Sequence, residues 1–334
     1  MAGGPRRGKR STGARGGRNA GAAAGLLLLA LLAAAALLLL RGSDPFEGAT
    51  LHVAPNSNAG RQAEEWRSSR PEDAALMGEL AGLPLAYWFD AGSGDVRAAV
   101  DRRVTEADEA GALPVLVAYN VPNRDCSGQS TGGASSEEEY GRWIRDFAAG
   151  IGDRDAVVVL EPDALALLDC LSKRDRAARL AVLKDAVGVL ESEGNTAVYL
   201  DAGHSDWVAA SEMANRLRGA GLEDAEGFAL NVSNYQRTSD NLDYGEDLSS
   251  RVGGKHFVVD TSRNGRGPAP GGEWCNPPER ALGEAPTSET AGLLADAYLW
   301  IKVPGESDGE CNGGPPAGTW WPEYALDLAR RAGY

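Results

Sequence analysis

Short apolar runs alternate with amphipathic stretches along most of the chain. The runs are rich in valine, leucine and aromatic residues, which is typical of buried parallel strands. They occupy residues 83–89, 113–119, 156–160, 196–200, 227–230, 256–259 and 297–301. Helical patterns lie between most of them, at residues 95–109, 137–149, 174–191, 207–219 and 242–252. The sequence therefore predicts an α/β fold in which seven parallel strands alternate with helices.

Polar residues follow every predicted strand at its C-terminal end. They are Asp90, Asn120, Asp125, Glu161, Asp163, Asp201, His204, Asn231, Asn234, Asp260, Lys302, Glu306 and Asp308. In a barrel these ends converge on one face, whereas a doubly wound sheet brings only two strands beside a ligand. The pattern favours a barrel, although an ordinary one needs eight strands. Two loops rich in glycine and proline, 262–286 and 304–318, replace regular structure late in the chain.

The first fifty residues have the pattern of a targeting segment. Residues 21–40 contain only glycine, alanine and leucine, and a helix of that length spans about one bilayer core of 30 Å. Residues 1–20 are basic, which is typical of the cytoplasmic flank of such a helix. The segment is either a retained transmembrane anchor or a cleaved signal, and the lack of a clear cleavage motif favours the anchor. Residues 41–50 then form a linker, and residues 51–334 form one exported catalytic domain.

Charge narrows the range of partners. The first 41 residues hold seven basic residues and no acid, which leaves 26 Lys and Arg against 48 Asp and Glu, a net charge of −22. Such a body repels phosphate backbones, so we expect no nucleic-acid partner. Three histidines without a paired motif predict no metal site, and the lack of a P-loop or a dinucleotide fingerprint predicts no cofactor. A neutral polymer rich in hydroxyls remains an open substrate class.

The four cysteines fit an exported protein, because their number is even and no CxxC motif occurs. Pairing of neighbours along the chain, Cys126 with Cys170 and Cys275 with Cys311, is the simplest of three possible connectivities.

The predicted strand ends combine carboxylates with aromatic residues, which are the residue types that glycoside hydrolysis uses. One carboxylic acid protonates the leaving oxygen while a second carboxylate acts on water or on the anomeric carbon. No GxSxG elbow is present. The structural alternative is that an acid at a strand end caps the helix that follows it.

Several local strings resemble glycoside hydrolase family 6, in the order of that family and over about 280 residues. The strings are Tyr119-Asn-Val-Pro-Asn-Arg-Asp-Cys126 with Ser130, Leu160-Glu-Pro-Asp-Ala-Leu165, Tyr199-Leu-Asp-Ala-Gly-His204 with Trp207, Asn231-Val-Ser-Asn-Tyr235, Asp260-Thr-Ser-Arg-Asn-Gly265, Trp274-Cys275-Asn276 and Ile301-Lys-Val-Pro-Gly-Glu-Ser-Asp-Gly309. The resemblance implies a distorted parallel barrel of seven strands, with the active site at their C-terminal ends. It also implies inverting hydrolysis of β-1,4-glucan.

The resemblance assigns catalytic roles to five residues. Asp163 is the position of the general acid, and Asp125 matches the carboxylate that raises the pKa of that acid and assists the water. Asp308 matches the other candidate base, so the identity of the base stays open. Ser130 lies where the family holds the attacking water, and Tyr119 lies near the distorted sugar.

The resemblance also implies sugar contacts and two disulfides. Aromatic platforms are Trp88, Trp207 and Trp274, and polar contacts are Asp90, Asp201, His204, Asn234, Lys302 and Glu306. The family's disulfides coincide with Cys126–Cys170 and Cys275–Cys311. Four of these residues have structural alternatives, since Trp88 and Trp207 could pack in the core, and Asp201 and His204 could be caps. Trp66, Trp320 and Trp321 have no assigned role and are expected to pack.

Loop length bears on where the polymer is cut. About 35 residues separate Cys275 from Cys311, and they must include the last strand, so little chain is left for a lid. We therefore expect an open cleft and internal cleavage by a monomer whose only membrane contact is the N-terminal segment. Two rival hypotheses are an envelope glycosidase acting on another β-glucan or wall glycan, and a non-catalytic glycan-binding protein.

Overall fold

Seven parallel strands form one sheet in the computed structural model, which describes residues 1–4, 8, 44–126, 128–192 and 194–333. Neighbouring strands in the sheet are also neighbours along the chain. The strands are β1 (Tyr87–Phe89), β2 (Val115–Ala118), β3 (Ala156–Leu160), β4 (Thr196–Asp201), β5 (Gly227–Leu230), β6 (His256–Asp260) and β7 (Ala295–Leu299). The predicted α/β fold with seven parallel strands is confirmed. The last strand begins two residues earlier than expected, and the first is confined to the end of its apolar run.

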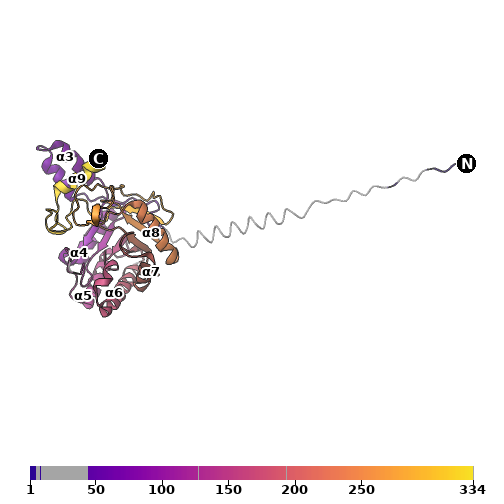
Figure 1. Ribbon diagram of the computed structural model, residues 1–334, viewed down its shortest axis with the longest axis horizontal. Coiled ribbons are helices and arrows are strands. Elements are labelled where there is room, and N and C mark those ends of the chain that lie inside the picture. The colour runs from indigo at the N-terminus through magenta and orange to yellow at the C-terminus, as the bar shows by residue number, and fades with distance from the viewer. Residues whose placement is uncertain (5–7, 9–43, 127, 193, 334) are drawn as a thin grey trace. The chain divides into compact units, whose positions relative to one another are not determined.

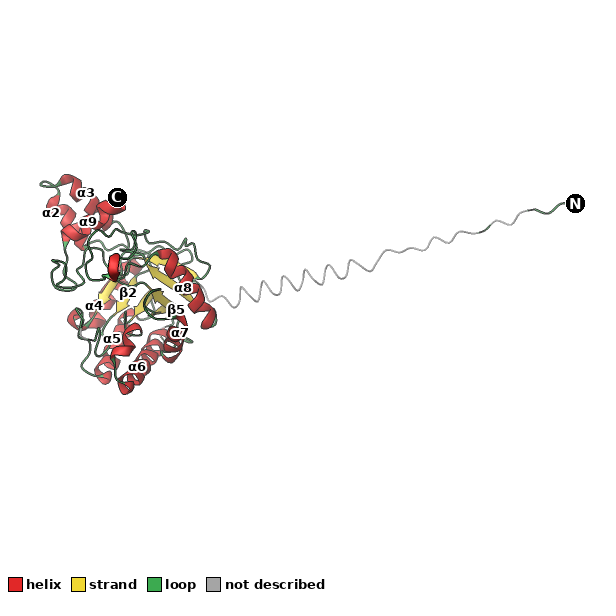
Figure 2. Cartoon of the chain, in the orientation of Figure 1, coloured by secondary structure: helices red, strands yellow, loops and turns green. Residues whose placement is uncertain are grey.

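Both faces of the sheet are buried, which explains the continuous apolar runs. One set of alternating side chains, such as Val117, Val159 and Val258, packs in the barrel interior. The other set, such as Leu116 and Val158, packs against the surrounding helices. These helices are α4 (Val96–Glu109), α5 (Glu137–Ile151), α6 (Lys173–Glu191), α7 (Ala210–Gly219) and α8 (Thr238–Arg251). Figure 2 shows the strands in yellow, with helices α5, α6 and α7 lying beside them. Each lies within a few residues of its predicted position.

The barrel closes incompletely between its first and last strands. β1 and β7 are not paired in the sheet, but the main-chain N–H of Ala86 donates to the carbonyl of Trp300 at 3.1 Å. The indole N–H of Trp88 donates to the carbonyl of Ile301 at 2.7 Å. These two bonds curl the edges of the sheet toward each other, and a seam remains between them.

Three helices that the sequence pattern did not predict pack together beside the barrel. They are α2 (Asn58–Trp66), α3 (Pro71–Ala81) and α9 (Pro322–Ala332). Figure 1 shows that α3, near the start of the described domain, lies beside α9 at its end. Arg70 joins them by an ion pair of 2.6 Å to Glu323. Their shared core contains Trp66, while Trp320 and Trp321 pack against its edge, as expected of residues without an assigned role.

The packed domain begins earlier than expected. Pro45–Tyr334 form one compact unit, and Phe46 is buried against Tyr199 in the barrel interior. Part of the predicted linker at residues 41–50 is therefore part of the core. Residues 21–40, the predicted membrane or signal segment, lie outside the described residues. Within the described residues, no helix has the length and hydropathy needed to cross a bilayer.

Candidate active site

A cleft of about 390 Å³ lies at the C-terminal ends of the strands. The structure brings together there all five residues expected to be catalytic, and most of the expected sugar contacts. The lining residues that the sequence had singled out are Trp88, Tyr119, Asp125, Ser130, Asp163, His204, Trp207, Asn234, Trp274, Lys302 and Asp308. Trp88 lines the cleft from within β1, and the other lining residues come from the loops after the six strands β2 to β7.

Asp163 follows β3, and the groups around it disfavour the ionised form of its carboxyl group. Burial raises the pKa of Asp163 well above its ordinary value, and the negative charges of Asp201, Asp125 and Asp308 raise it further. Lys302 acts in the opposite direction. A carboxyl group that stays protonated near neutral pH is suited to donate a proton to a leaving group.

Asp201 lies next to Asp163 but does not line the cleft. Its side chain is buried, and its Oδ2 accepts hydrogen bonds from the main-chain N–H groups of Asp163 at 2.9 Å and Gly203 at 3.1 Å. The other oxygen has no hydrogen-bond partner among the described residues. Burial raises the pKa of Asp201 to about 7. Its contacts therefore agree with the structural alternative, in which Asp201 holds the loop that carries Asp163.

Two further buried carboxylates hold loops in the same way. Glu161, at the end of β3, accepts main-chain hydrogen bonds from Asn120 at 2.9 Å and from Val121 at 3.0 Å. Asp260, at the end of β6, accepts from the main-chain N–H groups of Ser233, Ser262 and Lys302 at 2.9 to 3.0 Å. Each carboxylate thus fixes a loop that starts from a neighbouring strand.

The loops need such support because several of their residues are held in a strained conformation. Asp125, Glu161, Asp163 and Ser233 have left-handed φ angles between 51° and 68°, which non-glycine residues rarely adopt. Backbone strain of this kind persists only where surrounding contacts determine the conformation. The buried carboxylates supply these contacts and hold the catalytic loops in one shape.

Asp125 lies in the loop after β2 and is partly exposed to the cleft. One carboxylate oxygen accepts the main-chain N–H of Ser130 at 2.7 Å. The carboxylate lies so close to Gly128 that any Cβ at that position would clash with it. The disulfide Cys126–Cys170 ties this loop to the short helix η2 (Ala166–Cys170) that follows Asp163. The loops that carry Asp125 and Asp163 are therefore covalently linked.

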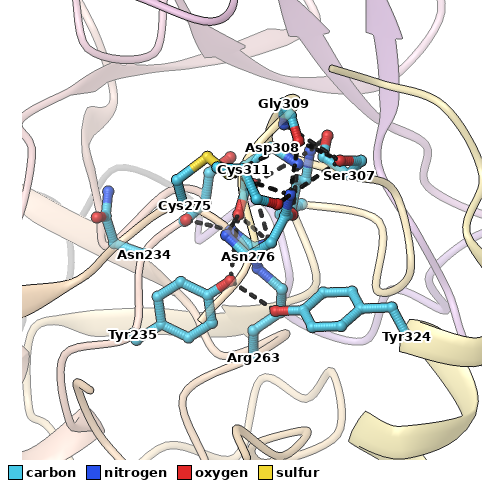
Figure 3. A network of polar contacts seen from close by, with 12 residues as sticks. Asn234, Tyr235, Arg263, Cys275, Asn276, Ser307, Asp308, Gly309, Cys311 and Tyr324 are labelled. Atoms are coloured by element: carbon cyan, nitrogen blue, oxygen red, sulfur yellow. Dashed lines mark hydrogen bonds and ion pairs between the residues drawn. A yellow bond between two sulfur atoms is a disulfide. The ribbon is translucent and has the colours of Figure 1, made fainter. Parts of the chain in front are cut away.

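Asp308 occupies the centre of a saturated polar network (Figure 3). Both of its oxygens accept hydrogen bonds from one nitrogen of the fully buried Arg263 at 2.9 Å. The hydroxyl of Tyr235 donates to Asp308 at 3.3 Å, and the main-chain N–H of Asn276 donates at 2.9 Å. Lys302 adds a cation at 3.7 Å. Asp308 is thus held by more hydrogen bonds than Asp125, whose carboxylate accepts only the N–H of Ser130 among the described residues.

The second disulfide encloses this network. Cys275 is bonded to Cys311, and the side-chain amide of Asn276 accepts the main-chain N–H of Asp308 and donates to the carbonyl of Gly309, both at 2.8 Å. Both disulfide pairings are those that the resemblance implied.

Two tryptophans offer exposed rings in the cleft. Trp274 is 51% exposed and Trp207 is 39% exposed. A flat apolar ring at the surface of a cleft suits the apolar face of a sugar. Trp88 is more enclosed, because its indole N–H is bonded to Ile301 and its ring meets Tyr119 edge to face at 5.1 Å.

His204 makes a structural contact and also lines the cleft. Its Nδ1 accepts the main-chain N–H of Asp206 at 3.2 Å, and its ring lies 5.3 Å from that of Trp207. Burial lowers the pKa of His204 to about 4, so the ring is neutral at neutral pH. The expected helix near Ser205 does not form, because α7 begins at Ala210, so His204 stabilises a turn instead of capping a helix, while its ring lines the cleft.

Besides Asp201, two of the predicted sugar contacts lie outside the cleft lining, Asp90 and Glu306. Asp90 accepts the main-chain N–H of Gly92 at 2.8 Å and caps the short helix η1 (Ala91–Ser93). It also forms an ion pair of 3.5 Å with Arg124. Glu306 accepts a hydrogen bond of 3.4 Å from Asn58 and lines a second cavity instead.

Other lining residues were not expected from the sequence. They include Asp206, Tyr235, Gln236 and Glu273. Arg263 was also not expected in the site, although it lies in the family-like string Asp260-Thr-Ser-Arg-Asn-Gly265. The sequence gives little reason to single it out, because most arginines in loops are exposed. Only a buried arginine needs a charged partner, and burial is known only from the structure. Among the described residues, no group of histidine, cysteine or carboxylate side chains is arranged to hold a metal ion.

The buried acids predict that the protein loses stability as the pH rises from about 5 to 8. Burial raises the pKa of Glu161 to about 7, as it does for Asp201, so the folded state binds more protons than the unfolded state in this window. This contribution to stability is complete below the unfolded-state pKa of about 4 to 4.5 and is lost as the pH rises through the folded-state pKa of about 7. The shift of Glu161 alone corresponds to about 3 kcal/mol. His204 acts oppositely, but only as the pH falls below about 6.5.

Urea unfolding followed at pH 5, 6, 7 and 8 would measure this dependence. We expect the variant Glu161→Gln to have a shallower pH slope than the wild type, because it removes one of the titrating groups. A stability that stays flat or rises over this range would contradict the prediction.

Comparison with known proteins places this architecture among described families. The sequence model of Glycosyl hydrolases family 6 matches residues 46–332. Endoglucanase A of Cellulomonas fimi is 49% identical over 270 residues, which make up 80% of this chain and 58% of that protein. Endoglucanase A of Thermobispora bispora is 43% identical over 291 residues, or 84% of this chain and 62% of the relative. The chain thus spans about three-fifths of the length of these two relatives.

Solved structures agree with the sequence matches. The endoglucanase Cel6 from Mycobacterium tuberculosis, in complex with methyl-cellobiosyl-4-deoxy-4-thio-β-D-cellobioside, matches with a TM-score of 0.84 and 44% identity. The match covers 87% of this chain and all of that one. Endoglucanase CEL6B from Humicola insolens matches with a TM-score of 0.75 and 25% identity.

Proposed function

The chain belongs to glycosyl hydrolases family 6, and we propose on this basis that it is an endoglucanase that cuts internal β-1,4 bonds of cellulose or a related β-glucan with inversion. The observation that carries the proposal is Asp163, whose pKa is raised by burial and by neighbouring carboxylates, in the same cleft as the partly exposed Asp125 and two exposed tryptophans. An acid, a second carboxylate and flat apolar platforms are the requirements of glycoside hydrolysis.

In the proposed reaction, Asp163 transfers its proton to the glycosidic oxygen as the bond to the anomeric carbon breaks. A water molecule attacks that carbon from the opposite face of the sugar and releases a proton to Asp125. The bond of Ser130 N–H to Asp125 orients the carboxylate that takes this proton. Asp308 acts through its charge, since Arg263, Tyr235 and Asn276 already occupy its oxygens. Tyr119 and Trp88 bound the sugar at the point of cleavage.

Internal cleavage is proposed from the openness of the platforms. Trp274 keeps half of its surface exposed, so a long chain need not be threaded from its end. The relatives from Cellulomonas fimi and Thermobispora bispora are named endoglucanases, which agrees with internal cleavage.

We propose that the domain is exported from the cytoplasm. Both disulfides would be unstable in a reducing cytoplasm, and residues 21–40 are the segment that would direct transport. We propose an extracellular or cell-surface monomer whose substrate is β-glucan, with membrane contact only through the N-terminal segment.

The stereochemistry of the product tests the proposal. We expect hydrolysis of cellohexaose to release the α-anomer first, because an inverting site places water rather than a carboxylate at the anomeric carbon. Proton NMR during the first minutes of the reaction, before mutarotation mixes the anomers, would measure it. An initial β-anomer would require a covalent intermediate and would overturn the mechanism. A reducing-sugar screen on carboxymethylcellulose, mixed-linkage β-glucan and peptidoglycan would define the substrate.

A further inference from the structure

A second cavity of about 410 Å³ shares a wall with the catalytic cleft. Trp88 lines both spaces. The loop after β7 also serves both, since Lys302 lines the cleft while Val303 and Glu306 line the second cavity. The two spaces therefore meet at the seam between β1 and β7, where the barrel is incompletely closed.

The second cavity combines apolar surface with hydrogen-bonding groups. Ala86, Tyr87 and Ala99 provide apolar surface from β1, the residue before it and α4. Asn58 lines the opposite side from the start of α2 and donates to Oε1 of Glu306 at 3.4 Å. This mixture of apolar surface and polar groups is typical of sites that bind organic ligands, and it suits a sugar ring with its hydroxyls.

Three arginines line the same cavity, and among the described residues only Arg103 is in an ion pair, with Glu106 at 2.8 Å. Arg61 donates to two neutral groups, the main-chain carbonyl of Asn56 and the side chain of Asn58. Arg102 is exposed and forms no hydrogen bond or ion pair with the residues that the structure describes. The N–H groups of Arg102 are therefore available as donors to sugar hydroxyls.

We propose that this cavity is an additional subsite, which binds the units of a β-glucan chain that extend past Trp88. The proposal rests on the proposed function and names where a long chain continues after it leaves the cleft. Trp88 lines both spaces, so we expect a chain that extends past this residue in the cleft to meet the second cavity next. Longer chains therefore gain contacts that shorter chains lack.

The dependence of hydrolysis on chain length tests this subsite. The specificity constant kcat/KM is measured for cello-oligosaccharides from three to six units, in the wild type and in the variants Arg102→Ala and Ala54→Trp. The first removes the uncommitted guanidinium, and the second fills the cavity from its half-buried wall. Arg97→Ala is the matched control, because Arg97 is an exposed arginine of the same helix α4 that does not line the cavity.

We expect Arg102→Ala to lower kcat/KM for the longest chain by about threefold to tenfold, the range of one lost hydrogen bond, and to leave the shortest chain unchanged. Ala54→Trp should show the same dependence on length, and Arg97→Ala should resemble the wild type. An equal loss at all lengths, or no loss at any length in Arg102→Ala, would overturn the subsite while the proposed function stands. A wild-type protein that cleaves none of the oligosaccharides would instead reject the proposed function, and the subsite with it.

Discussion

Hydrolysis of cellohexaose is expected to fall by about 10²- to 10⁴-fold when Asp163 is replaced by asparagine. The sugar alkoxide is a poor leaving group, so it must be protonated as the bond breaks. An amide is similar in size to the carboxyl group but has no proton of suitable pKa to give. The main-chain bond from residue 163 to Asp201 does not depend on the side chain, so the loop should keep its shape.

A substrate with an activated leaving group separates this role from a structural one. Dinitrophenyl β-cellobioside needs little protonation to lose its aglycone, so Asp163→Asn should lose much less activity on it than on cellohexaose. Asp146→Asn, in an exposed residue of α5, controls for a general effect of removing an acid. Equal losses of Asp163→Asn on both substrates would mean that this residue supports the site without acting as its acid.

The strands and the face that carries the site could be predicted because both leave local signals. Strands buried on both faces are continuous apolar runs, and each run ends in polar residues where the chain enters a loop. Helices α2, α3 and α9 were missed for different reasons. α3 has only a weak helical period, because its buried face uses Asp73, Met77 and Leu80. α2 and α9 have clear amphipathic patterns, so their helical period could have been read from the sequence.

The roles of individual acids could not be read from the sequence for a physical reason. Asp163 and Asp201 both follow buried strands, yet one side chain lines the cleft and the other turns to main-chain N–H groups. A carboxylate that caps a loop and one that catalyses a reaction occupy the same type of position. What separates them is the left-handed conformation of Asp163 and the burial of Asp201, and both depend on the complete fold.

Arg263 is predicted to be the residue outside the catalytic set whose loss most weakens the fold. Its guanidinium is fully buried, donates to both oxygens of Asp308 and to the carbonyl of Ser233, and lies 4.5 Å from the ring centre of Tyr235. Arg263→Met fills a similar volume but leaves the buried Asp308 without its main counterion. Removal of one partner of a buried ion pair typically costs about 3–5 kcal/mol of unfolding free energy. Urea unfolding at pH 7 would measure the loss.

The pH dependence of that loss identifies its cause. Without Arg263, the buried negative charge of Asp308 loses its main counterion, and burial penalises that charge. The deficit relative to the wild type is therefore expected to be largest at pH 8 and to shrink toward pH 4, where carboxylates begin to lose their charge. The double variant Arg263→Met with Asp308→Asn should recover part of the stability, because it removes the uncompensated charge of Asp308. Arg266→Met, in an exposed residue of the same loop, should change stability little. If the loss of stability did not depend on pH, it would come from lost packing and hydrogen bonds rather than from an uncompensated charge on Asp308. In that case the ion pair would not be what holds Asp308 in place.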